Sequence, residues 1–217
     1  MDRMTSALIV IDVQESFRQR PLWTAVSNPA VIGNVARLVT AARERGDLVV
    51  WVLHAEPGSD TPFDPDSGHV RLIEPLAAAP GEAVLTKTSR NAFTTTNLQQ
   101  VLTAHGVRHV VVTGIQTEQC CETTARLAAD YGYDVTFVTD ATATFPIEHR
   151  DAPAGRDVDA ILADLRTLGT DAVVERTEYA LAGRFAVIRT TASLLAREPV
   201  VGELVVGGPA VREPVAD

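Results

Sequence analysis

Five short apolar segments constrain the fold of this chain more than any other feature of its sequence. They cover residues 7–12, 48–54, 83–86, 109–113 and 134–140, and each is rich in β-branched residues with few polar interruptions. Such continuous apolar runs are typical of strands that are buried on both faces of a sheet. Because sheets covered on both faces are usually parallel, we predict a largely parallel sheet.

Helical patterns occupy the intervals between these segments. Residues 29–45, 98–105 and 119–131 have helical patterns, and each is followed at once by a glycine, a common helix stop. Further helices are predicted at 157–168, 171–182 and 191–196, with a sixth strand at 184–189. The alternation predicts an α/β fold, doubly wound, with a mostly parallel six-stranded sheet and helices on both faces.

The length of 217 residues suits one domain with a full-sized core. We assign residues 1–197 to this domain, since no linker separates two apolar cores. Residues 198–217 are rich in proline and glycine and form a C-terminal tail, either a partner-gripping arm or a frayed end.

Charge and cysteine content narrow the partners and the compartment. The formal net charge of −9 argues against nucleic acid or an anionic membrane as partner, because phosphate binding requires a basic surface. The N-terminal apolar run is short and carries Asp12, so we expect neither a signal peptide nor a membrane span. The two cysteines are adjacent and poorly placed for a disulfide. We therefore expect a cytoplasmic protein.

Three polar residues follow predicted strands, where open α/β sheets bind their ligands. Asp12 closes the first strand, Lys87 follows the third, and Cys120 follows the fourth through a Thr-Gly turn at the start of a helix. A helix N-terminus favours a thiolate, and its exposed amides can receive an oxyanion. By position alone, Cys120 fits a buried core cysteine equally well.

Asp12 and Lys87 each have an ordinary structural interpretation as well. An aspartate at a strand end can cap a helix or form a structural salt bridge, and most lysines only solvate the surface. However, Lys87 is the only lysine in the chain, and a cation beside a buried carboxylate and a thiol would hold both of them charged.

Taken together, four blocks resemble the isochorismatase-like cysteine hydrolases. They are Asp-Val-Gln at 12–14, Lys-x-x-x-Asn-Ala-Phe at 87–93, Gly-Ile-Gln-Thr-Glu-Gln-Cys-Cys-Glu-Thr-Thr-Ala-Arg at 114–126 and Gly-Tyr-Asp-Val-Thr-Phe-Val-Thr-Asp-Ala-Thr-Ala-Thr at 132–144. Each block is weak alone, and only their joint order is specific. The resemblance is strong over residues 6–145 and weaker over 184–196.

This resemblance implies a catalytic triad of Asp12, Lys87 and Cys120, with Cys121 left to packing. It also implies a cis peptide at Ile115–Gln116, whose turn aims the Gln116 and Cys120 amides at an oxyanion. The implied activity is cleavage of a small-molecule C–N bond, of amide, lactam or carbamoyl type, through a thioester. Glu118 departs from the family's usual Asp or Asn, which bears on substrate preference.

The sequence leaves two alternative functions open: an isochorismatase-type vinyl ether hydrolase, or a non-catalytic protein of this fold that binds a small molecule. Family nicotinamidases use an Asp-x-His metal motif after the second strand, and the segment at His54 does not reproduce it. We therefore expect no metal and no other cofactor. A dinucleotide-binding protein is set aside, because no Gly-x-Gly-x-x-Gly follows the first strand.

Phe17, Trp23 and Phe93 follow the catalytic strands and are predicted to contact the substrate, although core packing would explain them too. Residues 58–68, rich in Pro, Gly, Ser and Asp, could form a loop at the rim of the pocket. The family forms dimers and larger rings, so a homo-oligomer is expected.

Overall fold

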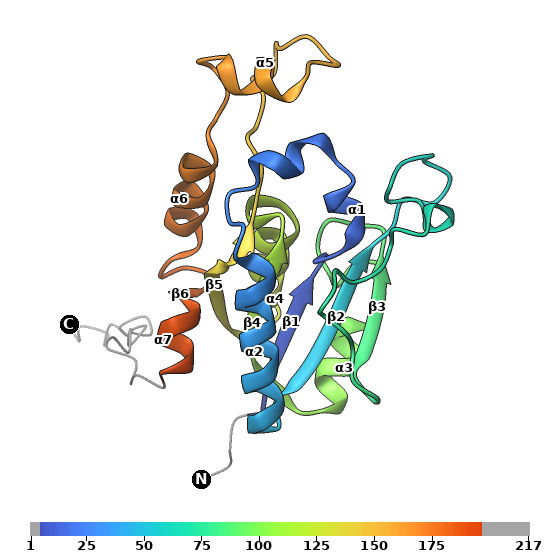
Figure 1. Cartoon of the computed structure of the whole chain (residues 1–217). Helices are drawn as coiled ribbons and strands as arrows, with labels where there is room; N and C mark the ends of the chain where they lie inside the picture. The colour runs from blue at the N-terminus through green and yellow to red at the C-terminus, as the bar shows by residue number, and fades with distance from the viewer. Residues whose placement is uncertain (1–4, 197–217) are drawn as a thin grey trace, which may run out of the picture.

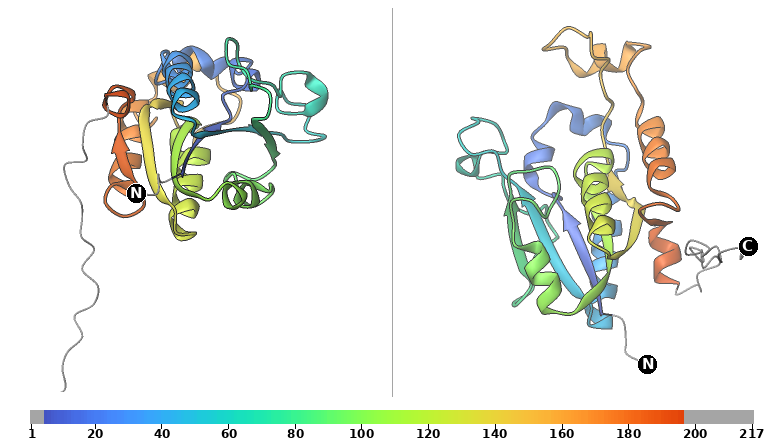
Figure 2. Two further views of the ribbon diagram at one scale, coloured as in Figure 1. Left: turned by 90° about the horizontal axis from the view of Figure 1, so that it is seen from below. Right: turned by 180° about the vertical axis from the view of Figure 1, so that it is seen from behind.

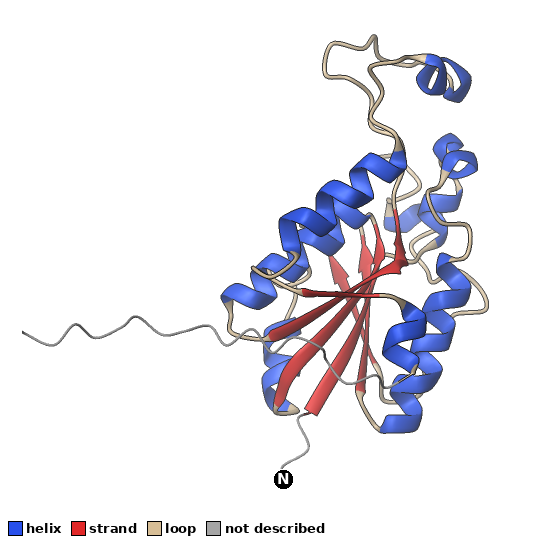
Figure 3. Ribbon diagram, turned by 90° about the vertical axis from the view of Figure 1, so that its left-hand side faces the viewer, coloured by secondary structure: helices blue, strands red, loops and turns tan. Residues whose placement is uncertain are grey.

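The computed structural model describes residues 5–196, which form a six-stranded sheet between two layers of helices (Figures 1 and 3). All neighbouring strands pair in parallel, in the order β3-β2-β1-β4-β5-β6. The strands are β1(Thr5–Ile11), β2(Leu48–His54), β3(Ala83–Lys87), β4(Val107–Ile115), β5(Asp134–Ala143) and β6(Val187–Arg189). The predicted doubly wound α/β fold is confirmed, and the sheet is parallel throughout.

Each face of the sheet carries its own apolar core, as expected for strands buried on both sides. On one face, α2(Val31–Arg45) and α7(Thr191–Leu195) cover residues such as Val10 and Trp51. On the other, α3(Leu98–Ala104), α4(Glu122–Asp130) and α6(Thr170–Leu181) cover residues such as Ile9 and Val112 (Figure 2). The remaining helical segments are α1(Glu15–Arg18), α5(Val158–Ala163), the 3-10 turns η1(Pro21–Ala25) and η2(Pro65–Ser67), and the π-helical turn η3(Thr117–Cys121).

One predicted helix was too long. The pattern predicted a helix over 157–168, but α5 ends at Ala163. Asp164 leaves the helical conformation, and its carboxylate accepts a hydrogen bond from the Arg166 backbone N–H. This local turn competes with the helix for the backbone, as aspartate often does. The sixth strand is likewise shorter than predicted and covers Val187–Arg189. The proposed tail at 198–217 lies outside the described residues.

Residues 147–168 form an arm that extends beyond the sheet (Figure 1). An antiparallel bridge between Ile147 and Leu168 closes its base, and α5 lies near its tip. Leu162, Leu165 and Leu168 expose 53%, 101% and 45% of their surface. The arm therefore adds apolar surface without adding to either core. Over residues 5–196, none of the helices is long and apolar enough to cross a bilayer.

Candidate active site

The strand order reverses at β1, which lies between β2 and β4. In open parallel sheets, this switch point leaves a crevice at the carboxyl ends of the strands. Gly114 allows β4 to come close here: a Cβ on this residue would lie 1.9 Å from the Ile11 carbonyl oxygen. Its φ of +129° is also a conformation that residues with a Cβ rarely adopt. The turn after β4 thus lies directly against the end of β1.

A cavity of about 430 Å³ opens at this edge, with Asp12 and Cys120 in its wall. Its other lining residues come from the segment after β1, the end of β2 and the loops that follow β2, β3 and β4. They are Phe17, Arg20, His54, Glu56, Thr61, Pro62, Phe63, Arg90, Gln116 and Gln119. The loop at 58–68 does contribute to the rim, through Thr61, Pro62 and Phe63.

Asp12 is fully buried and has a left-handed backbone, with φ of 54°. Such a conformation costs about 1–3 kcal/mol for a residue other than glycine and is found often at functional sites. The Asp12 N–H donates to the Val52 carbonyl at 2.8 Å and anchors this turn to β2. Burial raises the pKa of Asp12, although Lys87 and Cys120 partly offset that effect. Its carboxylate is therefore a stronger base than that of an exposed aspartate.

Lys87 contacts three functional groups from the end of β3, and it too is fully buried. Its Nζ lies 2.8 Å from Asp12 Oδ2, 3.4 Å from Cys120 Sγ and 3.3 Å from His54 Nδ1. An ammonium has three N–H donors, and these neighbours offer one acceptor for each. The predicted trio of Asp12, Lys87 and Cys120 is thus brought together in space by three different strand ends.

Cys120 lies in η3, just before α4, and lines the cavity with 4% of its surface exposed. Burial, together with the nearby Asp12 carboxylate, raises the pKa of its thiol to about 12, and Lys87 opposes this shift. The expectation of a stabilised thiolate was wrong for the resting state, because desolvation outweighs the cation. Cys121 has no exposed surface, belongs to the core, and has a pKa well above 9.0 because of burial.

His54 and Gln14 position the ends of β1 and β2, and neither role was predicted. The Gln14 side chain donates to the His54 carbonyl at 2.9 Å and accepts from the His54 N–H at 2.7 Å. Burial and the Lys87 charge lower the pKa of His54. A neutral His54 accepts from Lys87 at Nδ1, leaving Nε2 to face Glu56 Oε1 at 3.1 Å. The Asp-Val-Gln block could have predicted the role of Gln14, since it places a side-chain amide two residues after Asp12.

The peptide bond at Ile115–Gln116 is cis, as predicted. Gln116 and Cys120 both line the cavity, whereas their role as an oxyanion hole stays a prediction. Glu118 does not line it. Instead, its carboxylate accepts hydrogen bonds from Thr144 Oγ1 at 2.5 Å and from the side-chain amide of Gln116 at 3.4 Å. Glu118 thus holds the turn that carries Cys120.

Of the three aromatic residues predicted to contact substrate, the structure brings only Phe17 to this cavity. Trp23 packs behind it, with its ring 6.2 Å from that of Phe145. Phe93 lies in the core beneath α4, where its ring meets Tyr131 edge-on at 5.2 Å. Position after a strand did not fix the direction of these side chains. Phe63 supplies the second aromatic wall, with its ring 4.9 Å from that of Phe17.

Within residues 5–196, no group of three or more His, Cys, Asp and Glu side chains is placed to hold a metal ion. His54 has Glu56 nearby, but the opposite side of its ring faces the Lys87 ammonium, which is not a metal ligand. The expectation of metal-independent chemistry stays a prediction.

Known proteins are similar to this chain in both sequence and fold. The Isochorismatase domain profile matches residues 6–168. Streptothricin hydrolase of Streptomyces noursei is 36% identical over 148 residues, which are 67% of this chain and 57% of that one. Nicotinamidase 3 of Arabidopsis thaliana is 34% identical over 161 residues, 68% of this chain and 77% of that one.

A solved structure of a cysteine hydrolase from Pseudomonas syringae pv. phaseolicola 1448A superimposes with a TM-score of 0.74 at 26% identity. The match covers 88% of this chain and 91% of that one. With the domain profile matched over most of its length and the fold shared, this chain belongs to the isochorismatase family of hydrolases.

Proposed function

We propose that the protein is a cysteine-dependent hydrolase that cleaves a C–N bond of a small amide, lactam or carbamoyl compound through a thioester. The observation that carries this proposal is the buried contact of Lys87 Nζ with both Asp12, at 2.8 Å, and Cys120 Sγ, at 3.4 Å. Streptothricin hydrolase and Nicotinamidase 3, which are similar to this chain, support it by their names.

Burial and neighbouring charges set the resting protonation states of the proposed site. The Cys120 thiol keeps its proton, because its pKa is about 12. Asp12 lies beside the Lys87 ammonium, which holds it as a carboxylate. Attack on a substrate carbonyl therefore requires that Asp12 take the thiol proton as the C–S bond forms. A raised pKa of Asp12 makes this proton transfer less unfavourable.

The remaining steps follow from the same three groups. The tetrahedral oxyanion is received by the amides of Gln116 and Cys120. The leaving amine takes the proton from Asp12 as the C–N bond breaks, which leaves an S-acyl enzyme. Asp12 then takes a proton from water, the hydroxyl adds to the thioester, and the proton returns to sulfur. A free thiol nucleophile implies a reducing compartment such as the cytoplasm.

The test is a screen of small primary amides, lactams and carbamoyl compounds for release of ammonia or amine. On an active compound, Cys120→Ala should lose nearly all turnover and the acyl adduct that intact-mass spectrometry detects after acid quenching. Dialysis against a chelator should leave turnover unchanged. Full activity in Cys120→Ala would rule out thiol chemistry, and loss that zinc, iron or manganese restores would rule out the metal-independent form.

A further inference from the structure

With the buried Lys87 counted, the charged side chains at the cavity sum to one net positive charge: Arg20, Arg90 and Lys87 against Asp12 and Glu56. Asp12 is paired with Lys87, and Glu56 lies 3.7 Å from Arg90. Arg20 remains: across residues 5–196, its guanidinium has neither an ion pair with a carboxylate nor a side-chain hydrogen bond. The guanidinium instead lies over the ring of Phe145, with its carbon 5.4 Å from the ring centroid. Among the described residues at this cavity, Arg20 is thus the cation that has no carboxylate in ion-pair contact.

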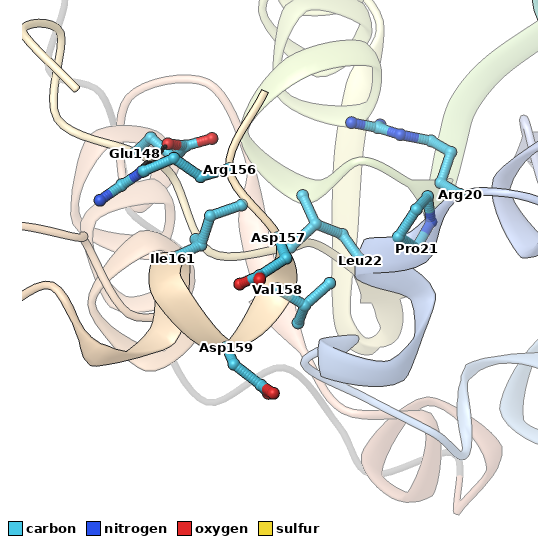
Figure 4. A pocket seen from close by; sticks show the side chains of 9 residues that line it. All are labelled: Arg20, Pro21, Leu22, Glu148, Arg156, Asp157, Val158, Asp159 and Ile161. Carbon is cyan, nitrogen blue, oxygen red and sulfur yellow. Dashed lines mark hydrogen bonds and ion pairs between the residues drawn. The ribbon is translucent and has the colours of Figure 1, made fainter. Parts of the chain in front are cut away.

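On the far side of Arg20, two carboxylates already have partners and a third points away. Arg20 also borders a second cavity, of about 580 Å³, beside the arm (Figure 4). There, Glu148 pairs with Arg156 at 2.8 Å, and Asp157 accepts a hydrogen bond from the Ala160 N–H that begins α5. The Asp159 carboxylate points away from the Arg20 guanidinium (Figure 4). Within residues 5–196, neither cavity places a carboxylate in ion-pair contact with Arg20; Glu56 is near enough only to raise its pKa.

Partial burial makes this isolated charge costly. It lowers the pKa of Arg20, and the nearby Arg90 lowers it further while Glu56 raises it. A guanidinium nevertheless stays protonated in proteins. A half-buried cation gains most from an anion that accepts two parallel N–H bonds, which is the geometry of a carboxylate.

We propose that Arg20 binds a carboxylate group of the substrate, so that the substrates are small amides or carbamoyl compounds bearing a free carboxylate. This inference rests on the proposed function, since it identifies which amides the cavity admits. A single uncompensated positive charge matches a carboxylate rather than a phosphate dianion. Arg90 is less available, because it already contacts Glu56 and His54.

A first experiment needs no substrate. Iodoacetate and iodoacetamide alkylate the same thiol and differ chiefly in charge, so their rate ratio at Cys120 reports the charge of the cavity. We expect Arg20→Gln to lower the iodoacetate-to-iodoacetamide ratio about tenfold, because hydrogen bonds to charged groups are among the stronger ones. Arg20→Lys should keep part of the preference. The matched control is Arg37→Gln, an exposed arginine of α2, which should keep the wild-type ratio.

The second experiment uses turnover. Glutaramate, its methyl ester and 4-aminobutanamide present a primary amide with an anionic, neutral or cationic end. We expect kcat/KM for ammonia release to be highest for glutaramate, and Arg20→Gln to lower the glutaramate-to-ester ratio about tenfold, mainly through KM.

The two hypotheses fail differently. If amides are hydrolysed but neither ratio changes in Arg20→Gln, the carboxylate site is wrong and the proposed function stands. If no amide in the panel or the wider screen is cleaved, while the alkylation ratio still depends on Arg20, the amidase function is wrong and the anion site stands. An equal fall in Arg20→Gln and Arg37→Gln would assign the effect to net charge and overturn the site.

Discussion

The adjacent thiols of Cys120 and Cys121 differ in what they can reach. Cys120 lines the cavity beside Asp12 and Lys87, whereas Cys121 is enclosed in the core with no exposed surface. Both pKa values are raised by burial, so neither thiol is ionised at neutral pH. Reactivity at Cys120 therefore requires a base that removes its proton during attack, and we propose Asp12 for this role.

Mild iodoacetamide treatment should therefore label Cys120 before Cys121, at a rate that falls in Asp12→Asn because the base is lost. Peptide mass mapping follows the two sites, and turnover should be lost in step with labelling of Cys120. Cys121→Val should fold and turn over normally, with a stability change below about 1.5 kcal/mol, since the volume is nearly kept. Labelling of Cys121 first would show that the wrong sulfur has been chosen.

If Asp12 is the proposed base, it should also set the acid limb of activity. Because its pKa is raised above 3.8 by burial, the carboxylate that we propose as the base is lost as pH falls through that raised value. We expect kcat/KM to fall at a pH above 3.8 in a profile measured after control incubations that prove the enzyme is intact. Asp12→Asn should lack this limb and lose about 10²–10⁴-fold in rate. An acid limb at or below 3.8 would contradict a buried base.

Sequence reasoning predicted that Asp12, Lys87 and Cys120 lie together, because strand ends converge at one edge of a parallel sheet, whatever the details of the loops. It could not place Phe93, since a position after a strand leaves the side-chain direction open. The position of Arg20 could not be predicted either, because it lies between α1 and η1, in a segment without a periodic apolar pattern. The thiol pKa was misjudged because burial depends on the packed tertiary structure, which a helix start does not reveal.

At the scale of elements, Glu82 joins three parts of the fold just before β3. Its carboxylate accepts hydrogen bonds from Trp51 of β2 at 2.7 Å and from Arg43 of α2 at 2.7 and 2.9 Å. The Ala79 N–H adds a further bond at 2.8 Å. Burial alone would raise the pKa of Glu82, but these bonds outweigh burial and lower the pKa to about 2.

This depressed pKa makes Glu82 a source of stability that depends on pH. The contribution is full above the unfolded value of 4.5 and is lost as pH falls towards the folded value of about 2. At pH 7, Glu82→Gln should lower the free energy of unfolding by about 2–3 kcal/mol, and this difference should shrink on acidification. Urea denaturation across pH measures it, with exposed Glu44→Gln of α2 as control. A pH-independent difference would assign the loss to packing alone.

At the scale of the whole molecule, the arm at 147–168 has the least support. It is closed at its base by one β-bridge, and Leu162, Leu165 and Leu168 face solvent, with Ile161 as its buried apolar residue. Exposed segments of this kind open locally at little cost in free energy. The arm also borders the second cavity, so its opening would alter the surroundings of Arg20.

Among the arginines of residues 5–196, trypsin should therefore cut first after Arg150, whose side chain is 87% exposed. Fragment masses identify the site, and Arg150→Gln should remove the first cut. Early cleavage within α2 would contradict the expected order of opening. The homo-oligomer implied by the family resemblance stays a prediction, and the same digestion bears on it: a second copy covering the arm would slow cleavage as protein concentration rises.

The central place of β1 affects the order in which the chain can acquire its native structure. β1 pairs with β2 on one edge and with β4 on the other, and β4 ends only at Ile115. A nascent chain emerging from the ribosome at roughly 5–20 residues per second has an open β1 edge for several seconds after β2 is complete. During that interval Asp12 has no thiol beside it, and an apolar strand edge is free to pair with other chains. Pairing of β4 with β1 thus brings Cys120 to Asp12 and shields that edge in one event. A chaperone would therefore bind the nascent chain mainly before β4 has been synthesised.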